Sequence, residues 1–159
     1  MDTNNQTQFD FTNMKGRVGK AYQIARDAHQ GQKDKAGAEY INHPVTVASN
    51  MGNDESAMIV ALLHDVVEDT NVTFEDLEEF LLPSELDALR LLTHDKTVPY
   101  MEYIEQIGKN NLATRVKIAD LKNNMDLTRL SVVTEKDRRR VEKYKKAFNF
   151  LAQIEERIK

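Results

Sequence analysis

The chain has 159 residues, of which 40% are hydrophobic and 30% charged, and its formal net charge at pH 7 is −4. This length and composition are typical of one globular domain, and the negative balance argues against a broad basic surface for nucleic acid. Cysteine is absent, which excludes disulfides, thiolate metal sites and cysteine nucleophiles, so metal ligands must come from His, Asp or Glu. Because no apolar run is long enough for a membrane span or a signal segment, we expect a cytoplasmic protein that contacts neither membrane nor nucleic acid.

Helical periodicity and helix-boundary residues predict an all-α fold, with a flexible N-terminal arm over residues 1–13 and one compact helical domain over residues 14–159. The predicted helices cover about residues 15–30, a short stretch opened by Pro44, residues 55–67, a short stretch capped by Thr73, and residues 83–92, 99–107, 111–127 and 134–158. We find no alternating β pattern and no internal repeat, which favours a single helical bundle.

The most informative segment runs from His64 to Asn71 and directly follows the apolar run 58–63. The predicted helix that carries this run is apolar almost all round, and a helix of this kind is normally buried. Burying an imidazole beside a carboxylate costs several kcal/mol unless both are paired or bind a metal. His64 and Asp65 therefore indicate a divalent cation site.

Two other segments supply residues of the same chemical kind. His43 follows a loop, and Asp120 lies on a largely apolar predicted helix. Lys117, Asp120 and Asn124 are spaced i, i+3 and i+7, which places them along one helix face. Two His and two Asp make a mixed nitrogen and oxygen ligand set that suits Mn, Fe, Zn or Co. An ion in such a site activates water and polarises a phosphoryl oxygen.

Glu68 and Asp69 are candidates for the group that activates water. If the buried helix continues to Asp69, Glu68 lies one turn after His64 and Asp69 one turn after Asp65, which suits a general base or a water-orienting group. Helix capping or solvation of these carboxylates is the alternative. Positive charge for a phosphate-rich ligand is available from Lys35, Lys96, Lys117, Lys122 and Arg140.

The ordered set of His43, His64-Asp65 and Asp120 resembles the HD superfamily of metal-dependent phosphohydrolases. Four segments, AHQGQ at 28–32, YINHP at 40–44, ALLHDVVEDT at 61–70 and VKIAD at 116–120, are similar to the hydrolase domain of RelA/SpoT proteins. DKTVP at 95–99 and RVEKY at 140–144 resemble the single-domain branch, the small alarmone hydrolases that include the metazoan SpoT homologue. The resemblance covers about residues 19–151.

This resemblance implies an HD phosphohydrolase domain with a metal centre between helices, holding one Mn(II) per chain or another divalent first-row metal. The implied ligands are His43, His64, Asp65 and Asp120, and the implied water-activating residues are Glu68 and Asp69. The implied reaction is Mn-dependent hydrolysis of the 3′-pyrophosphate of guanosine (p)ppGpp, which degrades the alarmone of the stringent response. Together with the charge argument, the expected substrate-binding residues are Lys35, Lys96, Lys117, Asn124, Arg140 and Tyr144. The partner is a small-molecule nucleotide, and the choice between monomer and homodimer is left open.

Two departures from the family pattern keep other substrates open. The family commonly has an Arg-Lys pair in the loop before the ligand histidine, with the arginine against the base, whereas this chain has Asp34-Lys35. The family's last motif often reads His-Asn-Met with a threonine soon after, whereas here Asn123 stands at the histidine position and Thr128 comes one place late. We therefore predict weak discrimination between guanine and adenine, and a gain in affinity for ppGpp in the variant Asp34→Arg.

Two alternative functions follow from these departures. One is a broader nucleotide phosphohydrolase, for example an NADPH 2′-phosphatase or an adenine alarmone hydrolase, using the same metal centre. The other is a catalytically silent HD module that senses nucleotides. The intact pair of Glu68 and Asp69 argues against the silent module, because a sensor does not need a water activator.

Overall fold

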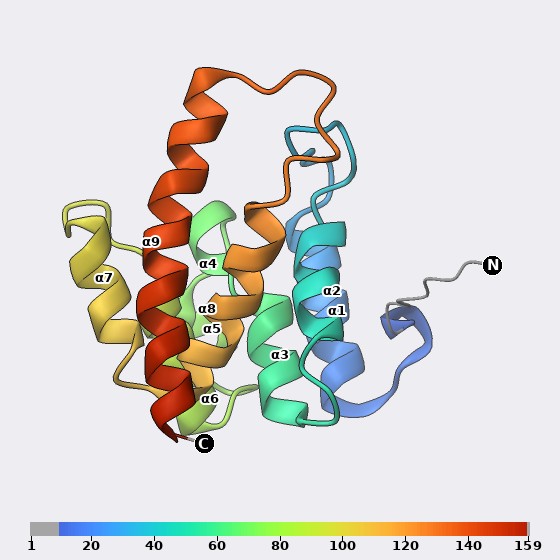
Figure 1. Ribbon diagram of the computed structural model, residues 1–159. Coiled ribbons are helices and arrows are strands. Elements are labelled where there is room, and N and C mark those ends of the chain that lie inside the picture. Colours follow the sequence, from blue (N-terminus) through green and yellow to red (C-terminus); the bar gives the residue numbers. More distant parts are fainter. Residues whose placement is uncertain (1–9, 159) are drawn as a thin grey trace.

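In the computed structural model, which describes residues 10–158, the chain forms helices joined by short loops (Figure 1). The α-helices are α1 (Gly16–Ala28), α2 (Asn42–Ser49), α3 (Glu55–Leu63), α4 (Val66–Asp69), α5 (Phe74–Leu77), α6 (Pro83–Leu92), α7 (Tyr100–Ile107), α8 (Asn111–Asn124) and α9 (Glu135–Ile158). Among the described residues, the β contacts are limited to one isolated bridge between Lys33 and Glu39. The all-α prediction is confirmed.

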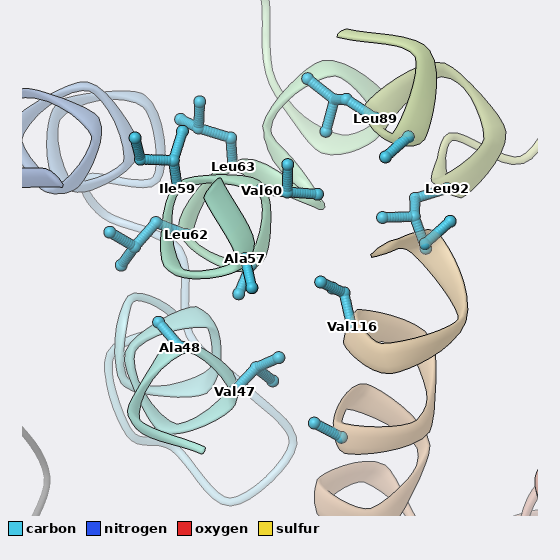
Figure 2. Packing of buried hydrophobic residues seen from close by; sticks show 14 of the residues in the cluster. Val47, Ala48, Ala57, Ile59, Val60, Leu62, Leu63, Leu89, Leu92 and Val116 are labelled. Carbon is cyan, nitrogen blue, oxygen red and sulfur yellow. The ribbon is translucent and has the colours of Figure 1, made fainter. Parts of the chain in front are cut away.

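Helix α3 is the central element of the core. The Asp54 side chain caps its first turn by accepting a hydrogen bond from the Ala57 amide (3.1 Å). Every residue from Ala57 to Leu63 is buried. Figure 2 looks nearly along α3 and shows its side chains pointing outward in all directions, toward α2, α6 and α8. Each fully buried aliphatic side chain of this kind stabilises the fold by about 1.5–3 kcal/mol, so α3 holds its C-terminal end at a fixed place.

The continuous helix predicted over residues 55–67 is wrong at His64 and Asp65. Helix α3 ends at Leu63, Asp65 has φ −107° and ψ 0°, and α4 starts at Val66. On an uninterrupted helix, consecutive side chains point about 100° apart and do not face the same neighbours. The break at this point allows His64 and Asp65 to lie beside the same carboxylate and imidazole groups.

The N-terminal arm predicted over residues 1–13 differs from the structure at its end, while residues 1–9 lie outside the described part of the chain. Asp10 caps a 3-10 helix, η1 (Phe11–Asn13). Phe11 is buried and stacks on Tyr22, with the ring centroids 6.4 Å apart. Burial of one aromatic ring thus outweighs the polar composition from which the arm was predicted.

Two long loops lie side by side at one end of the bundle, at the top of Figure 1. The first loop connects α1 to α2, and the second connects α8 to α9. An ion pair between Asp34 and Arg129 joins them, with Asp34 Oδ2 2.9 Å from Arg129 Nη1. Within residues 10–158, each helix is either too short or too polar to span a lipid bilayer.

Candidate metal centre

The structure brings together four residues that the sequence separates widely: His43, His64, Asp65 and Asp120. His43 lies on α2, His64 and Asp65 form the break between α3 and α4, and Asp120 lies on α8. One ligand atom of each residue lies within 4.8 Å of the corresponding atoms of the others, and Asp65 is the one member that is not fully buried. Since α2, α3 and α8 share one core, their packing fixes this arrangement.

Two carboxylate oxygens and two imidazole nitrogens face one another in this cluster. Asp120 Oδ1 lies 2.7 Å from His43 Nε2 and 3.2 Å from His64 Nε2. Asp65 Oδ2 lies 3.2 Å from His64 Nε2 and 3.8 Å from His43 Nε2. These are the donor atoms that a first-row divalent cation binds in proteins.

The hydrogen bonds of Nδ1, the other nitrogen of each imidazole, show whether the four residues suit a cation. His43 Nδ1 lies 2.6 Å from Asn123 Oδ1, and His64 Nδ1 lies 2.6 Å from the Ala61 carbonyl oxygen. Both partners only accept hydrogen bonds, so both Nδ1 atoms carry the proton. In a neutral ring, Nε2 then carries a lone pair that points at carboxylate oxygens. This lone pair and the carboxylate oxygens repel one another unless a positive charge lies between them. The residues therefore fit a divalent cation.

The pKa values of His64 and Asp120 also show that the site favours positive charge. Burial by itself lowers the pKa of His64, but the charges of Asp65 and Asp120 outweigh burial and raise this pKa well above its usual value. Burial raises the pKa of Asp120, but Lys117 and then His64 outweigh it, and the pKa falls well below its usual value. Burial raises the pKa of Asp65 too, but the charge of His64 outweighs it and lowers this pKa to about 2, so two anions are held ionised at the site.

A shell of hydrogen bonds orients the candidate ligands. Lys117 Nζ lies 2.9 Å from Asp120 Oδ2, and Asn124 Nδ2 donates to Asp120 Oδ1 at 3.0 Å. The Tyr40 hydroxyl donates to Asp65 Oδ2. The sequence prediction included Lys117 and Asn124 as substrate contacts but missed Tyr40, although its position three residues before His43 is the kind of signal that could have identified it.

Glu68 and Asp69 lie on the short helix α4, and both are exposed. Glu68 Oε1 accepts a hydrogen bond from the His94 amide at 3.0 Å, which fixes that carboxylate. Desolvation, followed by the charges of Asp65 and Glu68, raises the pKa of Asp69 to about 6. A carboxyl group with this pKa exchanges protons near neutral pH, which is the property required of a general base.

A second chain of contacts, which the sequence did not predict, holds α4 from the side of α1. Gln32 Nε2 donates to the backbone carbonyl of Asp69 at 3.1 Å, and Gln32 Oε1 lies 3.1 Å from His29 Nδ1. His29 is buried, with its ring centroid 4.9 Å from that of Tyr40. The end of α1 thereby fixes the position of the helix that carries both acidic residues.

A cavity of about 250 Å³ adjoins the cluster. Four of the six predicted substrate-binding residues line it: Lys35, Asn124, Arg140 and Tyr144. Tyr40 and Asn123, which contact ligand residues, line the same cavity, so it borders the shell of hydrogen bonds around the candidate ligands. Arg129 also lines it and was missing from the prediction. The signal for Arg129 is a contact with Asp34 across 95 residues, which no local pattern reveals.

The other two predicted substrate-binding residues lie elsewhere. Lys117 is buried beneath the site, with its ammonium against Asp120 and 5.3 Å from the centre of the Tyr103 ring. Lys96 is exposed, and its charge acts on the carboxyl group of Asp69. Lys117 is therefore placed to hold a candidate ligand, whereas Lys96 is placed beside the candidate base.

Comparison with known proteins gives an independent view of this chain. The HD-domain family model matches residues 21–87. The bifunctional (p)ppGpp synthase/hydrolase SpoT of Escherichia coli (strain K12) is 48% identical over 66 residues, which are 40% of this chain and 9% of that protein. A guanosine-3′,5′-bis(diphosphate) 3′-pyrophosphohydrolase of Drosophila melanogaster is 32% identical over 114 residues, which are 65% of this chain and 64% of that protein.

A solved structure covers most of the chain. It is described as a metazoan ortholog of SpoT that hydrolyzes ppGpp and plays a role in starvation responses. It superposes with a TM-score of 0.72 at 30% sequence identity, covering 87% of this chain and 86% of the other. The aligned part of this chain spans about a tenth of the length of SpoT. The predicted relationship to the HD superfamily and to RelA/SpoT hydrolase domains is confirmed.

Proposed function

Because this chain belongs to the HD-domain family and is homologous to SpoT, we propose that it is a metal-dependent hydrolase that removes the 3′-pyrophosphate of (p)ppGpp, with one Mn(II) per chain. We further propose that the protein degrades this alarmone in the cytoplasm as part of a stringent response. The observation that carries it is the juxtaposition of a cluster of His and Asp ligands with a cavity that Lys35 and Arg140 make positive. A pyrophosphorylated nucleotide needs both features at once.

The metal would be held by His43, His64, Asp65 and Asp120, and would supply Lewis-acid polarisation of a phosphoryl oxygen and activation of water. Around it, Asn123 and the Ala61 carbonyl fix the tautomers of the two imidazoles. Tyr40, Lys117 and Asn124 orient the two carboxylates. Supporting contacts of this kind typically change metal affinity or activity by about 10–100-fold.

Asp69 is proposed to receive one proton of the attacking water and to return it to the departing O3′. The water oxygen forms a bond to the phosphorus attached to O3′, the bond between that phosphorus and O3′ breaks, and the products are pyrophosphate and a nucleotide with a free 3′-hydroxyl. Without a bound cation the pKa of Asp69 is about 6, and a cation held by Asp65 would lower it, so Asp69 is ionised at neutral pH and able to accept a proton. Glu68, fixed by the His94 amide, is placed to orient the same water.

The cavity is proposed to hold the rest of the nucleotide. Lys35 and Arg140 supply charge for phosphate groups, and Asn124 extends from the metal side into the same space. Tyr144 offers an aromatic face, while its ring lies 6.3 Å from that of Tyr100. Lys96 is proposed to attract the leaving pyrophosphate from the side of Asp69.

The second candidate function is a broader nucleotide phosphohydrolase. The observation that favours it is the carboxylate of Asp34 at the cavity wall, where the family commonly has an arginine. An adenine alarmone or NADPH would use the same metal centre and the same cations. The silent sensor is disfavoured by the intact pair of Glu68 and Asp69 on α4, in which the His94 amide fixes Glu68.

The test is a product analysis with purified protein and Mn(II). The substrates are ppGpp, pppGpp, the adenine alarmone pppApp, NADPH and GTP, and the products are separated by ion-exchange chromatography. We expect pyrophosphate with GDP or GTP from the guanine alarmones, no reaction after chelation of the metal, and none from Asp120→Asn. Release of orthophosphate from NADPH without turnover of ppGpp would assign the second function instead.

A further inference from the structure

We propose that Arg129, held in place by Asp34, contacts the nucleobase in the cavity and makes the protein prefer guanine nucleotides. The inference rests on the proposed function, because it takes the ligand to be a purine nucleotide. Arg129 belongs to the loop between α8 and α9 and lies 95 residues after Asp34 in the sequence.

Asp34 acts as an anchor within its own loop. Its Oδ1 accepts hydrogen bonds from the Ala36 and Ala38 amides, both at 2.9 Å, and its Oδ2 faces Arg129 Nη1 at 2.9 Å. The side chain is only 14% exposed. Burial by itself raises the pKa of Asp34, but the Arg129 guanidinium and the two amides outweigh burial and lower it. The carboxylate is thus committed to the protein, and its role is to position Arg129.

Arg129 keeps most of its binding capacity despite this contact. A guanidinium has five N–H donors, and the ion pair with Asp34 engages Nη1. The side chain is 49% exposed and lines the cavity beside Leu127 and Leu130. A planar cation among aliphatic side chains matches the flat face and polar edge of a base. Lys35, a flexible point charge on the same cavity, suits a phosphate better.

The cavity has two chemically different ends, which orients the nucleotide. One end contains Tyr40, Asn123 and Asn124, which contact the candidate metal ligands. The other end is formed by the two loops that carry Asp34 and Arg129, beyond the end of α8 in Figure 1. The reacting 3′-phosphate must lie at the metal end, so the base, on the opposite side of the ribose, reaches the loop end.

The paired N–H donors of the arginine guanidinium then distinguish guanine from adenine. Guanine presents two acceptors, O6 and N7, to such a fork, whereas adenine presents one acceptor and one donor. Arg129 therefore favours guanine. In this proposal the guanidinium that contacts the base belongs to Arg129 and not to residue 34, so we expect a clear preference for guanine where the sequence predicted weak discrimination.

The test compares Arg129→Gln and Arg129→Lys with the wild type. Steady-state KM and kcat are measured with ppGpp and with its adenine counterpart, and bis(p-nitrophenyl) phosphate serves as a substrate without a base. The control is Arg138→Gln, which removes an exposed arginine that does not line the cavity. We expect Arg129→Gln to raise KM for ppGpp by about tenfold, the size of one lost stacked or bidentate contact. The guanine preference should fall by a similar factor.

The kcat for ppGpp and the turnover of bis(p-nitrophenyl) phosphate should stay within about twofold of wild type, since a base contact acts on binding. Arg129→Lys should not rescue KM, because lysine lacks the planar fork. Asp34→Asn should raise KM less than Arg129→Gln, and the double variant should be no worse than Arg129→Gln, because both changes remove one contact. An unchanged KM and base preference in Arg129→Gln would overturn the inference, as would an equal loss with the substrate that lacks a base.

Failure of the proposed function gives a different result. If wild-type protein does not hydrolyse ppGpp, equilibrium binding of ppGpp and its adenine counterpart is measured by calorimetry. Weaker binding of ppGpp by Arg129→Gln than by Arg138→Gln would then support the role of Arg129 while rejecting the reaction. Equal binding by both variants, or no binding by wild type, would overturn the inference.

Discussion

The metal cluster and the loop end of the cavity are built in opposite ways. The cluster joins α2, α8 and the end of α3 through buried groups, and each of its carboxylates contacts several partners. The loop end joins two loops through the pair of Asp34 and Arg129, whose arginine side chain is 49% exposed. One region is fixed by the core, and the other by a contact at the surface.

This difference determines what each region tolerates. Removing one member of a buried charge pair leaves its partner uncompensated and typically costs about 3–5 kcal/mol. An exposed ion pair is worth about 0.2–1 kcal/mol. The chemistry of the cluster is therefore hard to change, whereas a change in base recognition between the two loops costs less stability.

The largest expected effect comes from breaking the cluster. His64→Ala and Asp120→Ala should each lose the bound metal during dialysis and all measurable hydrolysis, because removing one of four protein ligands weakens the binding of a labile first-row ion. Metal content is measured by atomic spectroscopy after dialysis. The exposed Asp95, replaced by alanine, is the control and should keep about one ion per chain. Full metal content in both cluster variants would reject the ligand set.

The next effect separates proton transfer from metal binding. Glu68→Gln and Asp69→Asn should keep the metal and the KM for ppGpp but lower kcat by roughly 10²-fold or more, the scale of a lost general base. Single-turnover kinetics and metal content are measured on the same samples. Wild-type turnover in both variants would show that the base lies elsewhere, and loss of metal in both would make these residues ligands or supports.

The pH dependence of stability gives a subtler contrast. Asp69 is more readily protonated in the folded protein, with a pKa of about 6 against an ordinary value of 3.8. The folded state therefore binds more protons between these values, and the contribution of Asp69 to the free energy of unfolding falls as pH rises from about 4 to 6. Urea unfolding of metal-free protein should show this slope, and Asp69→Asn should remove it. An identical slope in both proteins would contradict the raised pKa.

The smallest effect is expected at the loop end. Asp34→Arg should lower the affinity for ppGpp, in contrast to the gain expected from the sequence, because the new cation repels Arg129 and leaves the Ala36 and Ala38 amides without their acceptor. We expect a loss of about 1–2 kcal/mol in the free energy of unfolding, the scale of a few lost hydrogen bonds. Metal content should not change. Tighter binding of ppGpp by Asp34→Arg would restore the interpretation drawn from the sequence.

The sequence by itself determined the helices and the chemical character of the site. Periodicity placed the buried helix that begins at Glu55, and Thr73 caps α5 as predicted. The candidate ligands could be predicted because a histidine and carboxylates on apolar helices require compensation, which is a local feature. These signals depend on residues within a few turns of one another.

Tertiary structure alone decided how these residues face one another. It set the break in the helix at Asp65. It also brought His43 to Asn123 and Asp34 to Arg129, contacts that join residues up to 95 positions apart. It also decided that the ammonium of Lys117 lies against Asp120 and does not line the cavity. Such contacts are set by the packing of helices that are distant in sequence, and residue types and spacing carry no record of that packing.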